Sequence, residues 1–146
     1  MNDKVILLVE DTASDIGLTQ RALKNNGIAN TLVVAEDGQE ALDYLFCSGD
    51  YFKRNSNEMP VLILLDLKLP RVDGFTVLRR IRADSRTRRI PVVILTSSAD
   101  ERDVTSGYDL GTNSYIRKPV DFNQFSEIVK QLGLYWLVTN EPPPKS

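Results

Sequence analysis

The feature that most constrains this chain is a series of short apolar runs separated by stretches with helical spacing. The runs are rich in Val, Ile and Leu and lie at residues 5–9, 31–35, 61–65 and 91–95, with a shorter one at 114–116. Apolar runs without polar alternation are typical of strands that are buried on both faces. The sequence therefore predicts five parallel strands with helices covering both sides of the sheet.

Between these runs, apolar residues recur every three or four positions, which predicts helices. Helix starts are indicated by Asp37, Asp73 and Asp121, and helix ends by Gly27 and Gly111. The last helix is expected at about residues 121–138, with one core-facing stripe. The residues of this stripe are Phe122, Phe125, Ile128, Val129, Leu132 and Tyr135. Five strands alternating with helices favour a flavodoxin-like, doubly wound α/β fold with strand order 2-1-3-4-5.

The length of 146 residues suits one domain with a single core. We predict this domain at 1–140, followed by a flexible tail at 141–146, because the Pro-rich sequence EPPPKS cannot continue a helix. The segment 47–60 is too long for an ordinary connection between a helix and a strand.

Composition excludes several functions. The chain has no histidine, which excludes a His-based catalytic triad, most zinc sites and a phosphohistidine relay within the chain. A net charge of -2 provides no general attraction for nucleic acid or membranes, so we predict neither as a partner. The single cysteine, Cys47, cannot form an internal disulfide, and no signal peptide or spanning helix is evident. A cytoplasmic location is the prediction.

Six arginines between residues 79 and 89 raise the alternative of a DNA-binding regulator. A charged run around a surface helix is more often a solvated face, and the chain offers no recognition helix after the fifth strand. Docking of an acidic partner protein is a further alternative that the sequence leaves open.

Reactive side chains follow four of the predicted strands. Glu10 and Asp11 end the first run, Asp66 the third and Thr96 the fourth, and Lys118 follows the fifth. Ligands of such sheets bind beyond the carboxyl ends of the strands, so we expect these groups to meet at one edge.

The chemistry of this group of residues suggests phosphoryl transfer. Glu10, Asp11 and Asp66 repel one another unless a cation lies between them, and hard oxygen ligands suit Mg²⁺. Asp66 could then attack phosphorus, with Lys118 stabilising the phosphoryl oxygens and the Thr96 hydroxyl donating to one of them. The alternative is a structural ion pair between Asp66 and Lys118.

The motifs at these positions resemble those of response-regulator receiver domains over nearly the whole chain. The segments that carry the resemblance are VEDTASD, LLDLKLPRVDG, ILTSSAD and GTNSYIRKPVD. It implies that Asp66 is the phosphoacceptor, that Glu10 and Asp11 bind metal, and that the Lys68 backbone carbonyl completes the metal ligands. It further implies roles for four other residues: Lys118 as a catalytic residue, Thr96 and Tyr115 as switch residues, and Pro119 as the site of a cis bond.

The long 47–60 segment and the ending GLYWLVTNEPPP resemble the stand-alone receivers that serve phytochrome-type sensor kinases. This resemblance implies a histidine kinase as phosphoryl donor, slow self-catalysed dephosphorylation and a homodimer. Apolar residues left over after the core stripe are candidates for the dimer interface, namely Leu134, Trp136, Leu137 and Val138. The alternative is that this segment folds back over its own domain.

A rival function is that of a haloacid-dehalogenase-like phosphatase, which also uses an aspartate nucleophile. That family has a second acid two residues after its nucleophile, where this chain has Lys68. It also has its acidic pair late in the chain rather than at Glu10 and Asp11. The sequence therefore favours a phosphoacceptor switch over an enzyme.

Overall fold

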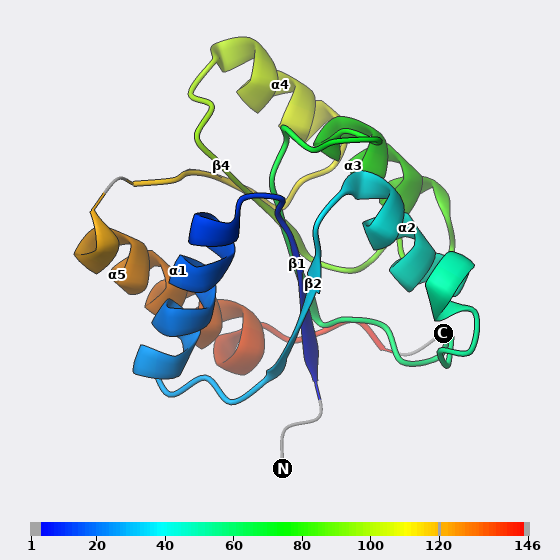
Figure 1. Cartoon of the computed structure of the whole chain (residues 1–146), viewed down its shortest axis with the longest axis horizontal. Helices are drawn as coiled ribbons and strands as arrows, with labels where there is room; N and C mark the ends of the chain where they lie inside the picture. The colour runs from blue at the N-terminus through cyan, green and yellow to red at the C-terminus, as the bar shows by residue number, and fades with distance from the viewer. Residues whose placement is uncertain (1–3, 120, 145–146) are drawn as a thin grey trace.

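The computed structural model describes residues 4–119 and 121–144, which form one parallel sheet with helices on both faces (Figure 1). The strands are β1 Val5–Val9, β2 Thr31–Ala35, β3 Leu62–Leu65, β4 Val92–Thr96 and β5 Ser114–Arg117. The helices are α1 Ala13–Asn25, α2 Gly38–Phe46, α3 Gly74–Ala83, α4 Glu101–Asp109 and α5 Phe122–Gly133. A 3₁₀ turn, η1, spans Gly49–Tyr51, and a π-helix, η2, spans Leu134–Thr139. Residues 1–3 and residue 120 of the predicted domain 1–140 therefore lie outside the described part.

The sheet has the order β2-β1-β3-β4-β5, which confirms the predicted flavodoxin-like topology. Alternate side chains of each strand point to two separate cores. On β3, Ile63 and Leu65 pack with α2 and α3, whereas Leu62 and Leu64 pack with α1 and α5. Figure 1 shows these two pairs of helices on opposite sides of the sheet. Burial on both faces explains why the strands read as continuous apolar runs.

The predicted helix starts at Asp37, Asp73 and Asp121 and the predicted helix ends at Gly27 and Gly111 are confirmed by their local contacts. The side chains of Asp37, Asp73 and Asp121 each accept a hydrogen bond from a backbone N–H in the first turn of α2, α3 and α5. Gly27 and Gly111 follow α1 and α4 with φ of 69° and 95°, a left-handed conformation that glycine adopts without strain.

The end of the chain differs from the single helix expected at 121–138. The α-helix ends at Gly133 and continues as the π-helix η2, in which the Asn140 N–H donates to the Tyr135 carbonyl five residues earlier. The wider turn changes the direction of the following side chains. Tyr135, expected in the core-facing stripe, is 51% exposed, while Trp136 and Leu137 pack against the core. The tail is described to residue 144, so residues 145 and 146 of the predicted flexible segment lie outside the described part.

The long segment 47–60 is organised around Arg54, a residue without a predicted role. The Arg54 guanidinium donates to the carbonyls of Tyr44, Leu45 and Glu58, at 2.7, 3.4 and 2.6 Å, and lies 4.2 Å from the centre of the Tyr44 ring. Because α2 has no basic residue in its last turn, Arg54 supplies the cation that the carbonyl end of this helix favours.

A second arginine fastens the edge of the sheet where the strands begin. The Arg82 guanidinium donates to the carbonyls of Gly111, Arg88 and Ile90, and to Oδ1 of Asn113, at 2.7–3.0 Å. Asn113 Oδ1 also accepts from the first residue of β4, at 2.8 Å. The charge pattern predicts a solvated face for Arg82, but this residue joins α3 to the loops that flank β4 and β5.

Candidate functional site

The register of the sheet brings the predicted reactive residues to one edge. Val9 of β1 pairs with Leu65 of β3, so the acids that follow them, Glu10 and Asp66, lie side by side. Thr96 is the last residue of β4 and pairs with Arg117, and Lys118 follows directly. The backbone N–H of Lys118 donates to the Thr96 carbonyl at 2.7 Å.

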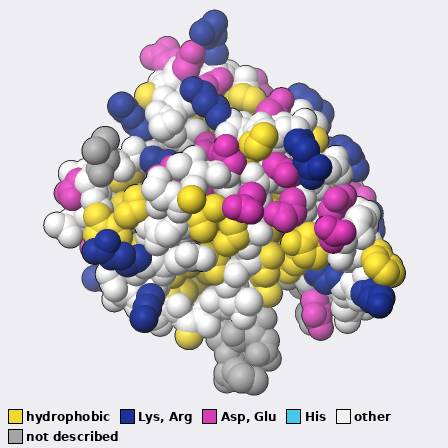
Figure 2. Space-filling view, in the orientation of Figure 1, with side chains coloured by type: hydrophobic (Ala, Val, Ile, Leu, Met, Phe, Trp, Pro, Cys, Tyr) yellow, Lys and Arg dark blue, Asp and Glu magenta, His cyan; other side chains and the backbone are white. Residues whose placement is uncertain are grey.

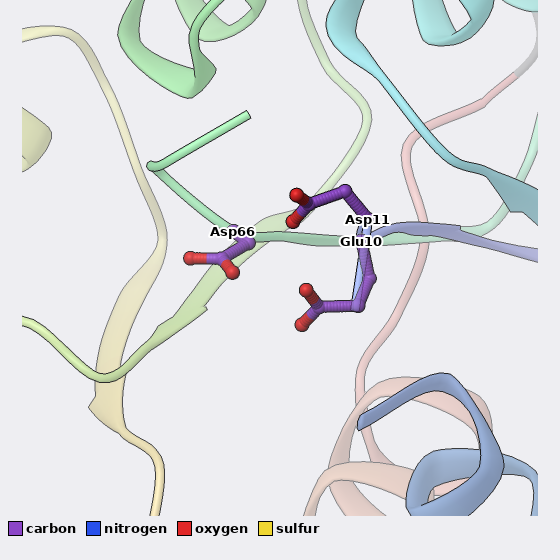
Figure 3. Close-up of side chains that lie close together, drawn as sticks. All are labelled: Glu10, Asp11 and Asp66. Carbon is purple, nitrogen blue, oxygen red and sulfur yellow. The ribbon is translucent and has the colours of Figure 1, made fainter. Parts of the chain in front are cut away.

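Glu10, Asp11 and Asp66 form an acidic cluster. One carboxylate oxygen of each lies within 4.8 Å of those of the other two. Glu10 and Asp66 are buried, whereas Asp11 is exposed. Figure 3 shows the Glu10 and Asp11 carboxylates both directed toward the Asp66 side chain. Figure 2 shows acidic side chains gathered across the middle of this face, around the carboxyl end of β1.

The Lys118 ammonium group bridges three carboxylates beside this cluster. Its Nζ donates to Glu10 Oε1, to Asp15 Oδ2 at 2.9 Å and to Asp66 Oδ2 at 3.1 Å. The Lys118 side chain is 11% exposed. Asp15, in the first turn of α1, is a site residue that sequence reasoning missed. Its position in the first turn of the helix that follows Glu10 and Asp11 is the signal that could have placed it at the same edge.

These contacts shift the pKa values in different directions. Burial raises the pKa of Glu10 from 4.5 to about 7, and the nearby Asp66 charge adds to the rise although Lys118 opposes it. Burial also disfavours ionised Asp66, but hydrogen bonds from Thr96 and Lys118 outweigh it and lower the pKa of Asp66. Burial likewise opposes the charge of Lys118, yet its bonds to Glu10 and Asp15 raise the pKa of the ammonium group. Asp66 is therefore ionised and available as a nucleophile at neutral pH.

The backbone around Asp66 is tightly held. Its Oδ1 accepts a hydrogen bond from the N–H of Leu67 at 2.7 Å. The start of α3 packs directly against this loop, and a Cβ added at Gly74 would lie only 2.3 Å from the Asp66 carbonyl oxygen. Glycine at this position therefore allows α3 to approach the backbone of Asp66 closely and to hold this residue at the edge of the sheet.

The two predicted switch residues lie on either side of the loop after β4. Thr96 is completely buried next to Asp66, whereas Tyr115 is partly buried and its hydroxyl donates to the Ser98 carbonyl at 2.9 Å. Lys68 lies two residues beyond Asp66 with an exposed side chain. Every peptide bond in the described residues is trans, so the prediction of a cis bond before Pro119 is wrong. The trans form of such a bond is favoured by about 0.5–1 kcal/mol unless its surroundings select the cis form.

The donor set fits a divalent metal ion. Glu10, Asp11, Asp15 and Asp66 bring four carboxylates together, and Lys118 supplies one compensating positive charge. The excess negative charge and the all-oxygen ligands match the preference of hard cations for carboxylates and water. Glu10, Asp11 and Asp66 are the side chains that could hold such an ion.

Comparison with known families matches residues 6–130 to the response regulator receiver domain. The chain belongs to this family. Response regulator Rcp1 of Synechocystis sp. is 40% identical over 136 residues, which make up 93% of this chain and 90% of Rcp1. The Mn²⁺-bound structure of Rcp1 is similar with a TM-score of 0.87, covering 97% of this chain and 99% of that one.

Two further structures are similar over most of their length. The phosphorylated cyanobacterial phytochrome response regulator RcpA is 43% identical with a TM-score of 0.90, covering 97% of this chain and 99% of that one. The bacteriophytochrome response regulator RtBRR is 49% identical with a TM-score of 0.78, covering 99% of this chain and 86% of that one.

Membership of the receiver family makes the chain a phosphoacceptor signalling protein of two-component regulation, with an acidic metal site and a histidine kinase as partner. The phosphatase alternative is therefore set aside. Among residues 4–119 and 121–144, every helix is too short or too polar to traverse a lipid bilayer.

Proposed function

We propose that Asp66 accepts a phosphoryl group from a phytochrome-type histidine kinase, with Mg²⁺ held by the acidic cluster, and that the chain then changes the surface it offers to partners. The observation that carries this proposal is the Lys118 ammonium group bound to Asp66 Oδ2 at 3.1 Å beside the Glu10 and Asp11 carboxylates. This arrangement keeps a nucleophile ionised next to a group that binds phosphoryl oxygens.

The transfer follows from the chemistry of these groups. A carboxylate oxygen of Asp66 attacks the phosphorus of a phosphohistidine, and the bond between phosphorus and the imidazole nitrogen breaks. The bonding electrons leave with the imidazole, and Asp66 becomes an acyl phosphate. Lys118 donates to a phosphoryl oxygen as charge moves onto it. Release of the phosphate by water would return Asp66 to its carboxylate.

Mg²⁺ is proposed to be held by Glu10, Asp11 and Asp66 and by the backbone carbonyl of Lys68. When bound, it would neutralise the carboxylates and the incoming phosphoryl oxygens. The all-oxygen donor set and the Mn²⁺-bound structure of Rcp1 support this assignment.

Thr96 and Tyr115 are proposed to report the phosphorylation. The Thr96 hydroxyl would turn from the carboxylate of Asp66 to a phosphoryl oxygen, and Tyr115 would exchange its bond to Ser98 for a more buried position. Such a movement would change the surface formed by α4, β5 and α5.

The direct test is labelling by a small phosphodonor such as acetyl phosphate, followed by mass spectrometry. We expect one phosphate on Asp66 in Mg²⁺ and none in a chelator, because the carboxylates otherwise repel the phosphate. Asp66→Asn should abolish labelling, while Asp109→Asn, the same change at an exposed helix end, should retain it. Phosphate on Thr96 or Ser97, or full labelling in chelator, would refute the assignment.

A homodimer through the end of the chain is the second part of the proposal. Leu134, Tyr135 and Val138 are 53%, 51% and 76% exposed, so this segment presents large apolar side chains to solvent. Trp136 and Leu137 pack on their own domain, so they contribute less to an interface than the sequence suggested.

The test of this surface is sedimentation with and without a phosphoryl mimic on Asp66. The double change Leu134→Ser and Val138→Ser should give a monomer. Phe52→Ser, at a residue 67% exposed on the 47–60 segment, is the matched control and should leave the mass unchanged. A monomeric wild type in both states would refute the dimer.

The proposal also places the chain in the cytoplasm, since Cys47 has no second cysteine with which to pair.

A further inference from the structure

Asp15 belongs to the site through its contact with Lys118 but lies outside the acidic cluster. It stands in the first turn of α1, and its Oδ2 accepts from Lys118 Nζ at 2.9 Å. The cluster that could hold a metal ion consists of Glu10, Asp11 and Asp66. Asp15 is therefore directed at the ammonium group rather than at the candidate metal position.

The hydrogen-bonding capacity of Lys118 is already filled. An ammonium group has three N–H donors. In this structure Glu10, Asp15 and Asp66 accept from Nζ, one carboxylate for each donor. A phosphoryl oxygen on Asp66 needs a donor from Lys118, so one of the three carboxylates must give up its bond when the phosphoryl group arrives.

The exposure of the three carboxylates indicates which one leaves. The Glu10 and Asp66 side chains are 3% and 10% exposed, whereas Asp15 is 31% exposed. A buried carboxylate that loses its partner is costly, but one in contact with water exchanges one hydrogen bond for another. Asp66 becomes an acyl phosphate, so its own bond to Lys118 passes to the phosphoryl group that it carries. Of the two carboxylates that remain anionic, Glu10 and Asp15, the more exposed Asp15 is thus the acceptor that a further phosphoryl oxygen displaces at the lowest cost.

We propose that Asp15 is a positioning residue that holds Lys118 in the unphosphorylated chain and is displaced by the phosphoryl oxygen. The inference rests on the proposed role of Asp66 as phosphoacceptor. Asp15 competes with the phosphoryl group for Lys118 and adds a negative charge close to it. Both effects weaken phosphoryl binding, so Asp15 limits how strongly the phosphorylated form is favoured.

The experiment measures binding of beryllofluoride, a phosphoryl mimic, by calorimetry at saturating Mg²⁺. We expect Asp15→Asn to bind it about tenfold more tightly than wild type, which corresponds to about 1.4 kcal/mol. A structural role would produce the opposite result, because damage to the site weakens binding. Asp15→Glu keeps a carboxylate within reach of Lys118 and should return the affinity toward the wild-type value.

Glu127→Gln on the exposed face of α5 controls for the loss of one negative charge and should bind like wild type. Mg²⁺ affinity, measured without the mimic, should not increase in Asp15→Asn, since removing a negative charge cannot strengthen cation binding. Equal or weaker mimic binding by a folded Asp15→Asn variant, or the same gain in Asp15→Glu, would overturn the inference.

The two proposals fail in different ways. A wild-type chain that neither binds beryllofluoride nor accepts phosphate on Asp66 would contradict the proposed function itself. A wild-type chain that does both, alongside an Asp15→Asn variant without a gain, would contradict only the role of Asp15.

Discussion

Replacing Glu10 by glutamine should stabilise the metal-free protein. Glu10 is buried against Asp66, and burial raises its pKa to about 7 despite the contact with Lys118. The folded chain thus resists ionisation of this group at neutral pH. Glutamine has the same shape, keeps an oxygen for the Lys118 ammonium group and carries no charge, so Glu10→Gln removes the unfavourable ionisation from the folded state.

The size of the effect follows from linkage between protons and folding. A pKa raised from 4.5 to about 7 corresponds to roughly 3 kcal/mol, at about 1.4 kcal/mol for each pH unit. Between these two pH values the folded chain holds a proton that the unfolded chain has released, so raising the pH favours unfolding. Glu10 therefore destabilises the wild type fully above about pH 7 and not at all below pH 4.5. The lowered pKa of Asp66 acts in the opposite direction at lower pH.

The measurement is urea unfolding in a chelator at several pH values from 4.5 to 8, followed by circular dichroism. The variant should exceed the wild type by about 3 kcal/mol at pH 8, and the difference should disappear near pH 4.5. Mg²⁺ should reduce the difference, since a divalent cation stabilises the ionised carboxylate in the wild type. Glu127→Gln, at an exposed position on α5, should follow the wild-type profile. A difference between Glu10→Gln and wild type that does not change with pH would refute the reasoning.

Three further predictions concern single contacts. Lys118→Met should lower the free energy of unfolding in chelator by about 3 kcal/mol, because it leaves buried carboxylates unpaired, and Mg²⁺ should restore part of it; a variant as stable as wild type in urea would contradict this. Arg54→Ala should cost about 1–3 kcal/mol and expose residues 47–60 to proteases, since it removes the bonds to the carbonyl end of α2; unchanged proteolysis would count against it. Tyr115→Phe should cost about 1 kcal/mol through the lost bond to Ser98, and equal melting temperatures would show that water replaces this bond.

The strands and the main site residues could be predicted because each depends on a local pattern. Burial on both faces leaves an unbroken apolar run such as 62–65, and parallel strands bring the residues after their carboxyl ends to a common edge. The positions of Glu10, Asp66 and Lys118 at one site follow from those two rules. The caps of α2, α3 and α5 were similarly predictable, because one aspartate satisfies each helix start.

The features that could not be predicted depend on helix rotation and on contacts between distant segments. Tyr135 fits a stripe with α-helical spacing, but the change to a π-helix after Gly133 rotates it outward and turns Trp136 inward. Asp15 contacts Lys118 through a side-chain hydrogen bond, although the two residues are 103 positions apart in the sequence. The bonds of Arg54 and Arg82 go to backbone carbonyls, and carbonyls leave no signature in a sequence.

The hydrogen bonds of Arg82 hold the C-terminal end of α4 more firmly than its N-terminal end is held. Its guanidinium joins α3, the start of β4 and the turn after α4 at the edge opposite the acidic cluster. At the other end of α4 the first turn is held by the polar side chains of Asp100 and Asp103, and Gly107 is the buried residue within the helix. A rearrangement that begins at Thr96 would therefore pivot α4 about its C-terminal turn, so that displacement is largest at the helix start and smallest at Gly111.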